Sequence, residues 1–124
     1  MRGSGVLKEV YWVASAREDL RSFPEAVRQV VGYALYLAQH GDKHPDAKPL
    51  KGFGGAGVLE IVEDYDGDTY RAVYTVRFKD VLYVLHAFLK KSKKGIATPK
   101  PDIELIKGRL KVAAEHYAAS LRRA

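Results

Sequence analysis

The sequence contains no cysteine, so disulfide bonds and cysteine-ligated zinc sites are excluded. No apolar run approaches the roughly 20 residues of a membrane-spanning helix. The first ten residues, MRGSGVLKEV, lack the long apolar region of a secretory signal. The four histidines are spread along the chain, and we expect no metal and no cofactor. These absences favour a cytoplasmic protein.

The composition and charge of the chain suit a small basic domain. A length of 124 residues and a hydrophobic content of 47% predict a single domain over residues 1–124, with residues 1–5 disordered. The formal net charge is +6, which suggests a phosphate-rich partner such as nucleic acid, or an acidic protein. The alternative is an ordinary domain that happens to be basic.

Local patterns predict an α+β fold, in which an antiparallel sheet packs on helices in the order β-α-α-β-β-β-α. Ser15 and Glu18 have the spacing of a capping box, and Gly41 is suited to end a helix in the left-handed conformation. The apolar repeat after Thr98 and Pro99 indicates a final helix. The expected elements are a strand over 6–13, a short helix after Ser15, a helix from Pro24 to about His40, strands over 58–63, 69–78 and 81–89, and the last helix.

The segment 42–57 is rich in glycine, proline and polar residues, so we expect a loop there. It carries Lys48 and Lys51, but no Gly-Lys-Ser/Thr closes its glycine-rich run, so it is not a P-loop. Asp66-Gly67 and Lys79-Asp80 are expected to form two-residue turns, which join the last three strands into an antiparallel meander.

The two turns set the register, and the register sorts side chains onto two faces of the sheet. It places Arg71 opposite Phe88, and Val73 opposite His86. The expected apolar face, which should pack on helices, holds Leu59, Ile61, Tyr70, Ala72, Tyr74, Val76, Phe78, Val81, Tyr83, Leu85 and Ala87. The opposite face, a candidate reaction surface, holds Glu60, Val62, Arg71, Val73, Thr75, Arg77, His86, Phe88 and Lys90.

Three segments together resemble the RelE/HigB superfamily of bacterial toxins, in particular its phage-derived HigB-like branch. They are KPLKGFGG (residues 48–55), YRAVYTV (residues 70–76) and VLHAFLKKSKKGIATP (residues 84–99). The resemblance implies a RelE-like fold and the toxin of a type II toxin–antitoxin pair. Such a toxin is a metal-independent endoribonuclease that cuts mRNA, usually on the translating ribosome, by attack of a ribose 2′-hydroxyl on the adjacent phosphate. A cognate antitoxin, often a helix-turn-helix DNA-binding protein, would neutralise it.

The resemblance also points to catalytic residues. Arg71 matches the strand arginine of the family, and its planar guanidinium can bind two phosphate oxygens; the alternative is a structural salt bridge with Glu60. A basic segment follows the last strand, and one of its lysines could act as general acid, with Lys90 or Lys91 placed nearer the scissile phosphate than Lys94. That segment contains Lys90, Lys91, Lys93 and Lys94.

Other roles stay open at the level of sequence. Glu60 could be the general base or only the partner of Arg71, and His86 could be an acid or base or a packed strand histidine. Phe88 could stack on a base or pack in the core. The candidate contacts to the RNA backbone are Lys48, Lys51, Arg77, Lys93 and Lys94. A non-catalytic module that binds nucleic acid or protein on the same fold is the alternative function.

Overall fold

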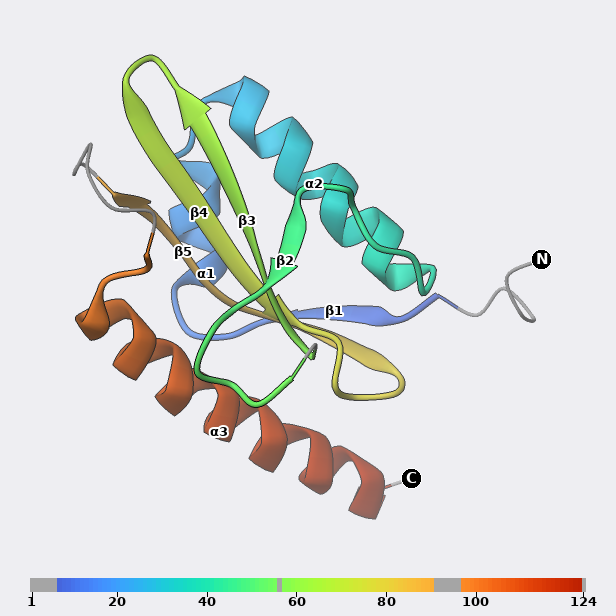
Figure 1. The fold of residues 1–124 in the computed structure, drawn as a ribbon. Helices are drawn as coiled ribbons and strands as arrows, with labels where there is room; N and C mark the ends of the chain where they lie inside the picture. The colour runs from blue at the N-terminus through green and yellow to red at the C-terminus, as the bar shows by residue number, and fades with distance from the viewer. Residues whose placement is uncertain (1–6, 56, 91–96, 124) are drawn as a thin grey trace.

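A five-stranded sheet separates two layers of helix (Figure 1). Helices α1 and α2 cover one face, here called the α2 face, and α3 crosses the other, the α3 face. This arrangement confirms the expected α+β class. The computed structural model describes residues 7–55, 57–90 and 97–123. Its elements are β1 (Glu9–Trp12), α1 (Ala16–Arg21), α2 (Glu25–Gln39), β2 (Ala47–Pro49), β3 (Val58–Tyr65), β4 (Asp68–Thr75), β5 (Val81–Lys90) and α3 (Lys100–Arg123).

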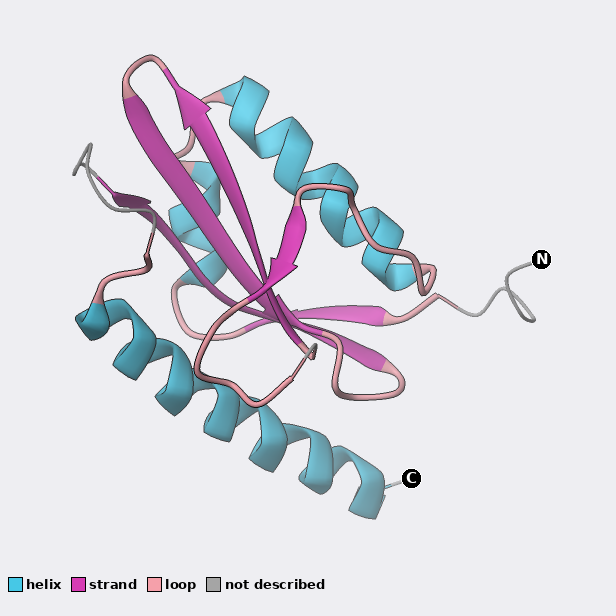
Figure 2. Cartoon of the chain, viewed as in Figure 1, coloured by secondary structure: helices cyan, strands magenta, loops and turns pink. Residues whose placement is uncertain are grey.

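The strands lie in the order β1-β5-β4-β3-β2, so β4 is central (Figure 2). Neighbouring strands from β2 to β5 run antiparallel, as the meander predicts. Strand β1 instead runs parallel to β5, which makes the sheet mixed. The connection between these two strands spans most of the chain, and this length makes a parallel pairing possible.

Strand β2 corrects the expectation of an uninterrupted loop over 42–57. It pairs with β3, with Ala47 opposite Ile61 and Pro49 opposite Leu59. Its three residues give too short a pattern to be recognised in sequence, and proline argues against a strand. Proline is tolerated here because β2 is the edge of the sheet and need not donate a hydrogen bond on its outer side.

The turn between β3 and β4 forms as predicted. Asp66 and Gly67 both have positive φ, 52° and 85°, which is the requirement of a type I′ hairpin turn. The next turn is longer than expected, because β4 ends at Thr75 and not at Phe78. Past that point the chain no longer pairs with β5. Val76 still donates its backbone N–H to the carbonyl of Gly57, the residue before β3.

A β-bulge in β5 restores the predicted register beyond this turn. Tyr74 pairs with Val84, whereas the preceding residue, Val73, pairs with His86. Leu85 therefore has no partner on β4 and is the extra residue of the bulge. The predicted pairs beyond the bulge, Arg71 with Phe88 and Val73 with His86, are confirmed.

The same bulge makes part of the predicted face assignment wrong. Val81, Tyr83 and Leu85 were expected beside Tyr74, but they lie in the apolar cluster under α3. One extra residue reverses the side on which all earlier residues of the strand project. Strict alternation along β5 could not reveal this.

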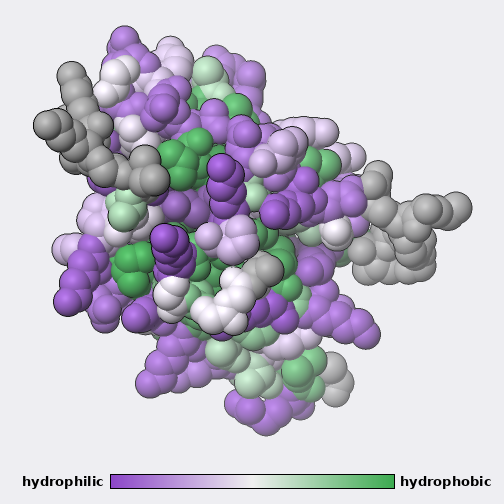
Figure 3. Space-filling view, in the orientation of Figure 1, coloured by the Kyte–Doolittle hydropathy of each residue, from purple (hydrophilic) through white to green (hydrophobic). Residues whose placement is uncertain are grey.

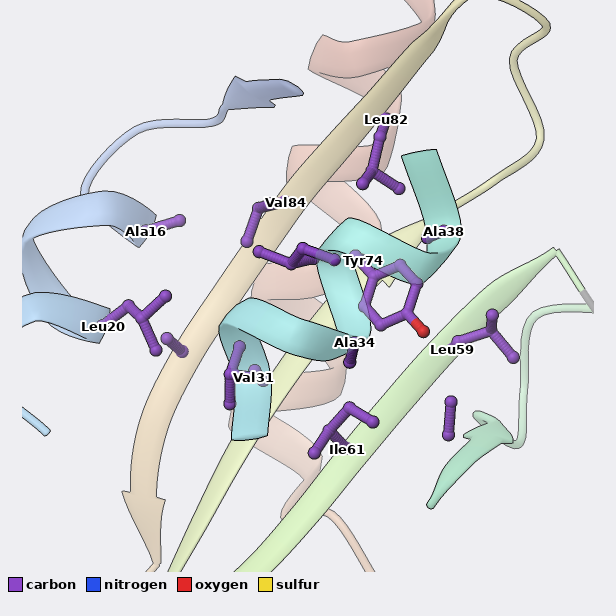
Figure 4. Packing of buried hydrophobic residues seen from close by; sticks show 14 of the residues in the cluster. Ala16, Leu20, Val31, Ala34, Ala38, Leu59, Ile61, Tyr74, Leu82 and Val84 are labelled. Atoms are coloured by element: carbon purple, nitrogen blue, oxygen red, sulfur yellow. The ribbon is translucent and has the colours of Figure 1, made fainter. Parts of the chain in front are cut away.

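The α2 face is almost entirely apolar, and Figure 4 shows its packing between the sheet and helices α1 and α2. Tyr74 lies in the middle of this cluster, and its hydroxyl has no hydrogen-bond partner among the described residues. Burial raises the pKa of Tyr74 to about 12. The other members of this cluster that Figure 4 labels are Ala16, Leu20, Val31, Ala34, Ala38, Leu59, Ile61, Leu82 and Val84.

Helix α3 contacts the sheet through a narrow stripe. Ile106 and Ala113 are the buried residues of its described length, and Leu110 and Tyr117 are partly buried beside them. Charged side chains from α3 also reach the sheet, and they form part of the candidate site.

The ends of the first helices differ in how well the sequence predicts them. Helix α2 ends with Gly41 at a φ of 83°, and Asp42 donates its N–H to the Leu37 carbonyl (2.8 Å), which confirms the glycine stop. Ser15 precedes α1, but its hydroxyl donates to the carboxylate of Asp19 (2.7 Å) and makes no cap with a backbone N–H. The expected capping box is therefore wrong, although the helix begins where it was expected.

The face seen in Figure 3 is mainly hydrophilic, with separate apolar patches. Among the described residues, no helix combines the length and the apolar character needed to cross a bilayer.

Candidate functional site

A network of three side chains, two of them buried, lies on the α3 face. Arg71 on β4 is 2% exposed, and its Nη1 lies 3.2 Å from Oε1 of Glu60 on β3, which is 9% exposed. The same Nη1 donates to the hydroxyl of Thr98 (3.2 Å), and that hydroxyl donates to Oε2 of Glu60. We call Arg71, Glu60 and Thr98 the Arg71 network. Its geometry makes Glu60 the ionic partner of Arg71.

A second buried group connects β5 to α3. His86 is 7% exposed, and its Nε2 lies 2.8 Å from Oδ1 of Asp102. Nη1 of Arg109 lies 3.5 Å from Nδ1 of the same ring, so both ring nitrogens face α3 side chains. The imidazole also stacks on Phe88, with ring centroids 4.5 Å apart and planes at 16°. His86 is thus enclosed on three sides.

Arg109 explains how the bulge of β5 is accommodated. Its Nη1 donates to the carbonyl of Leu85 (2.9 Å), the residue left without a partner on β4. Its Nη2 donates to the hydroxyl of Ser15 (3.3 Å), which precedes α1. One α3 side chain therefore provides a hydrogen-bond donor for the Leu85 carbonyl and connects the helix to both β5 and the start of α1.

Two further cations lie on the same face as the Arg71 network. Lys48 on β2 is exposed and lies directly opposite Glu60, so it projects from the same α3 face. Lys90 ends β5 two residues after Phe88, on the same side as Arg71, and its Nζ donates to the Ala97 carbonyl (2.7 Å). The structure thus brings cations from β2, β4 and β5 to one face.

The remaining predicted basic residues are placed differently. Lys51 is exposed in the turn after β2. Arg77 lies beyond the end of β4, where its Nη2 donates to the Phe53 carbonyl. A Cβ at Gly57 would lie 2.4 Å from the Arg77 side chain, so that side chain is packed against the loop before β3. Lys91, Lys93 and Lys94 lie outside the described residues.

Sequence reasoning missed three side chains of this site. Thr98 was assigned to the cap of α3, but its hydroxyl contacts Arg71 and Glu60 instead. Asp102 and Arg109 were given no role. Their spacing of seven residues places them on one side of α3, flanking the apolar stripe that contains Ile106. Their position at the edge of an apolar stripe was the signal in the sequence from which a contact with the sheet could have been predicted.

The described residues offer no metal site: no three histidine, aspartate or glutamate side chains come together in a way that could hold an ion. His40 and His44 are four residues apart, but α2 ends before them, at Gln39. Nδ1 of His40 lies 2.8 Å from the Tyr36 carbonyl, and Nδ1 of His44 accepts the backbone N–H of Asp46 (3.0 Å). The two rings therefore do not share one helical face.

Comparisons with solved structures identify the fold. A mutant of the Escherichia coli toxin RelE in the free state matches with a TM-score of 0.50 and 20% identity, over 65% of this chain and 81% of that one. The RelBE2 toxin–antitoxin complex of Mycobacterium tuberculosis matches with a TM-score of 0.45 and 20% identity, over 72% of this chain and 98% of that one. The first match shows a RelE-like fold, as the sequence resemblance implies.

Comparisons of sequence identify the family. No curated protein matches the chain. The model of the family described as phage-derived protein Gp49-like (DUF891) matches residues 18–111, which is more than half of the sequence and extends from α1 into α3. With its RelE-like fold, this chain belongs to the phage-derived Gp49-like protein family.

Proposed function

We propose that this protein is the toxin of a type II toxin–antitoxin pair and inhibits translation as an mRNA endoribonuclease. The observation that carries the proposal is the convergence of Lys48, Arg71 and Lys90 on one face of a RelE-like sheet. RNA cleavage without a metal needs cations that stabilise the charge developing on the phosphate. Arg71 and the two lysines come from three different strands of the sheet.

The proposed reaction is attack of a ribose 2′-hydroxyl on the adjacent phosphate, with loss of the 5′-oxygen. Arg71 would bind the phosphate, which must compete with Glu60 for the guanidinium. Lys90 or Lys91 would protonate the leaving oxygen. The proton of the 2′-hydroxyl would pass to Glu60 or His86. Glu60 keeps lone pairs free beside its contact with Arg71, and His86 could accept on Nδ1, once Arg109 has moved away, while Asp102 stays on Nε2.

The other proposed contacts are to the RNA chain around the cleaved bond. Lys48 and Lys51, both exposed, would bind backbone phosphates, and so would Lys93 and Lys94. One face of the Phe88 ring already stacks on His86, and Nη2 of Arg77 already donates to the Phe53 carbonyl. We therefore place Lys48 and Lys51 ahead of Arg77 and Phe88 as RNA contacts.

The partners proposed with this function are mRNA, the translating ribosome and a cognate antitoxin in the cytoplasm. An antitoxin that neutralises the protein would cover the cationic face with acidic or apolar segments. The helix-turn-helix DNA-binding activity of such pairs would belong to the antitoxin.

One observation favours the alternative, a non-catalytic binding module on the same fold. Arg71 and His86 are both buried and both engaged, which is also what a purely structural role would produce. Such a module would still bind polyanions through its exposed lysines. The two functions differ in whether RNA is cut.

Inducible expression in bacteria tests the proposal. We expect wild-type protein to arrest growth and to fragment mRNA, and a Lys48→Gln/Lys90→Gln variant to lose most of this effect. A Lys43→Gln/Lys111→Gln variant is the matched control, because it removes two exposed charges outside the site and should arrest growth like wild type. Soluble, folded wild-type protein that neither arrests growth nor fragments mRNA would overturn the proposed function.

Arg71→Ala is less informative in this assay, because loss of Arg71 leaves Glu60 buried without its ionic partner. Loss of toxicity could then result from unfolding. The lysine variants avoid this ambiguity.

A further inference from the structure

Thr98 is the residue of the Arg71 network that has no part in the proposed chemistry. A hydroxyl has one hydrogen to donate and lone pairs to accept, so Thr98 can bind the guanidinium and the carboxylate together. It accepts from Nη1 of Arg71 at 3.2 Å and donates to Oε2 of Glu60, whose Oε1 lies 3.2 Å from the same Nη1. Each of the three groups therefore contacts the other two.

The position of Thr98 in the chain gives this contact a second consequence. Thr98 follows the lysine-rich segment 91–96 and comes two residues before α3. Its neighbour Ala97 accepts a hydrogen bond from Lys90, the last residue of β5. The residues on either side of the lysine-rich segment are thus joined to each other and to the Arg71 network.

A role limited to capping α3 does not explain the geometry. The first backbone hydrogen bond of the helix runs from the Ile103 N–H to the Pro99 carbonyl (3.0 Å). The Thr98 side chain is directed away from the helix, to partners 27 and 38 residues earlier in the sequence. The hydroxyl is thus bonded to side chains of the sheet and not to the backbone of the helix.

We propose that Thr98 is a positioning residue for the cleavage reaction: its hydroxyl holds the Arg71 guanidinium in place beside Glu60. This inference rests on the proposed nuclease function. Thr98 acts through Arg71 and need not touch the RNA. Its removal should therefore lower the rate of the chemical step more than it weakens RNA binding.

Purified variants test this. Thr98→Val keeps the shape of the side chain and removes the hydroxyl, whereas Thr98→Ser keeps the hydroxyl. Cleavage of a single-stranded or ribosome-bound message gives kcat and KM, and chemical denaturation of each variant gives its stability. We expect kcat to fall about 10- to 100-fold in Thr98→Val, the usual cost of a misplaced catalytic group. KM should change much less, and Thr98→Ser should restore kcat to near the wild-type value.

Ser120→Ala is the control. The hydroxyl of Ser120 donates to the Tyr117 carbonyl (2.7 Å) near the end of α3, away from Arg71 and Lys90. Ser120→Ala should leave kcat unchanged. Should Thr98→Val fail to fold, Thr98→Ala takes its place, because the connection before α3 is only partly buried.

The outcomes separate the two proposals. Wild-type protein that cuts no RNA overturns the proposed function itself. Active wild-type protein with a kcat unchanged in Thr98→Val overturns the role of Thr98 and leaves the function standing. A fall in kcat that Thr98→Ser does not restore also overturns it, because the hydroxyl would then not be responsible.

Discussion

The two faces of the sheet are buried by different means. The α2 face is closed by aliphatic and alanine side chains, and Tyr74 supplies a hydroxyl with no partner in the described structure. The α3 face buries an arginine, a glutamate and a histidine together with an apolar stripe. The two layers that cover one sheet thus differ in polarity.

This difference in polarity distinguishes a face that only packs from a face that can also carry a functional site. Apolar burial stabilises the fold without directional requirements, whereas each buried charge must be paired or it destabilises. Buried ion pairs often contribute less stability than apolar residues of similar volume. The burial of Arg71, Glu60 and His86 is therefore weak evidence for a gain in stability, and the proposed RNA site is on the face that holds them.

Removal of Arg71 should have the largest effect. Arg71→Ala leaves the Glu60 carboxylate buried without its ionic partner, and such losses cost about 3–5 kcal/mol in the free energy of unfolding. Urea denaturation followed by circular dichroism measures this cost.

The double variant Glu60→Leu/Arg71→Met tests the origin of that loss. It replaces the ion pair by apolar side chains and should recover most of the stability without restoring RNA cleavage. A double variant as unstable as Arg71→Ala would show that the buried charge was not responsible, and the contrast between the faces would lose its basis.

Removal of Asp102 should have an intermediate effect, since it breaks one polar contact between α3 and the sheet. Asp102→Ala should lower the free energy of unfolding by about 1.5–3 kcal/mol, the range for hydrogen bonds to a charged group. Hydrogen exchange should accelerate in α3 more than in α2. The matched control is Glu104→Ala on the same helix, whose exposed pair with Lys107 (3.9 Å) should contribute less than about 1 kcal/mol. Equal effects of the two variants would refute the assignment.

Loss of one tyrosine hydroxyl from each face should have the smallest effect. Tyr74→Phe removes a buried hydroxyl that has no partner among the described residues, so stability should stay equal or rise by about 1 kcal/mol. Tyr83→Phe removes a hydroxyl that lies 2.8 Å from Nδ1 of His116 on α3, and should cost about 0.5–1.5 kcal/mol. Effects of the same sign and size would contradict the comparison.

The pH dependence of Tyr74→Phe provides a further check. Burial raises the pKa of Tyr74 from 10.0 to about 12, so the folded state favours the protonated phenol. The stability contributed by this preference is present below pH 10 and is lost as pH rises from 10 to about 12. Wild-type protein should therefore lose stability relative to Tyr74→Phe across that interval, by about 2–3 kcal/mol. Parallel pH profiles would show that the phenol ionises as freely in the folded state as in the unfolded chain.

Short-range signals in the sequence predicted most of the fold. Asp66-Gly67 specifies its own turn, and Gly41 specifies the end of α2, because both requirements are local. The pairing of Arg71 with Phe88 was also predicted, but for an incomplete reason. The turn before β5 is longer than two residues, and the bulge at Leu85 compensates for the difference. Two departures from the expected geometry cancel at the site.

The contacts of the site were less predictable, because they join residues distant in sequence. The ion pair of Glu60 with Arg71 was one of two readings open from the strand register. The contact of Thr98 with both residues was not foreseen, since a threonine before a proline and a helix fits a cap equally well. The engagement of His86 by Asp102 and Arg109 depends on the place of α3 on the sheet, which no local pattern specifies.

The bulge at Leu85 has a consequence for relatives of this chain. If Leu85 were deleted, the residues of β5 that remain would alternate without interruption, and each would keep its present face. The strand therefore carries one inserted residue, and the other residues of the strand alternate between the faces as if it were absent. The carbonyl of that residue is bound by Arg109. In an alignment of the family, we expect a gap at this position to coincide with loss of the arginine seven residues after Asp102, so that the inserted residue and its helix partner are gained or lost together.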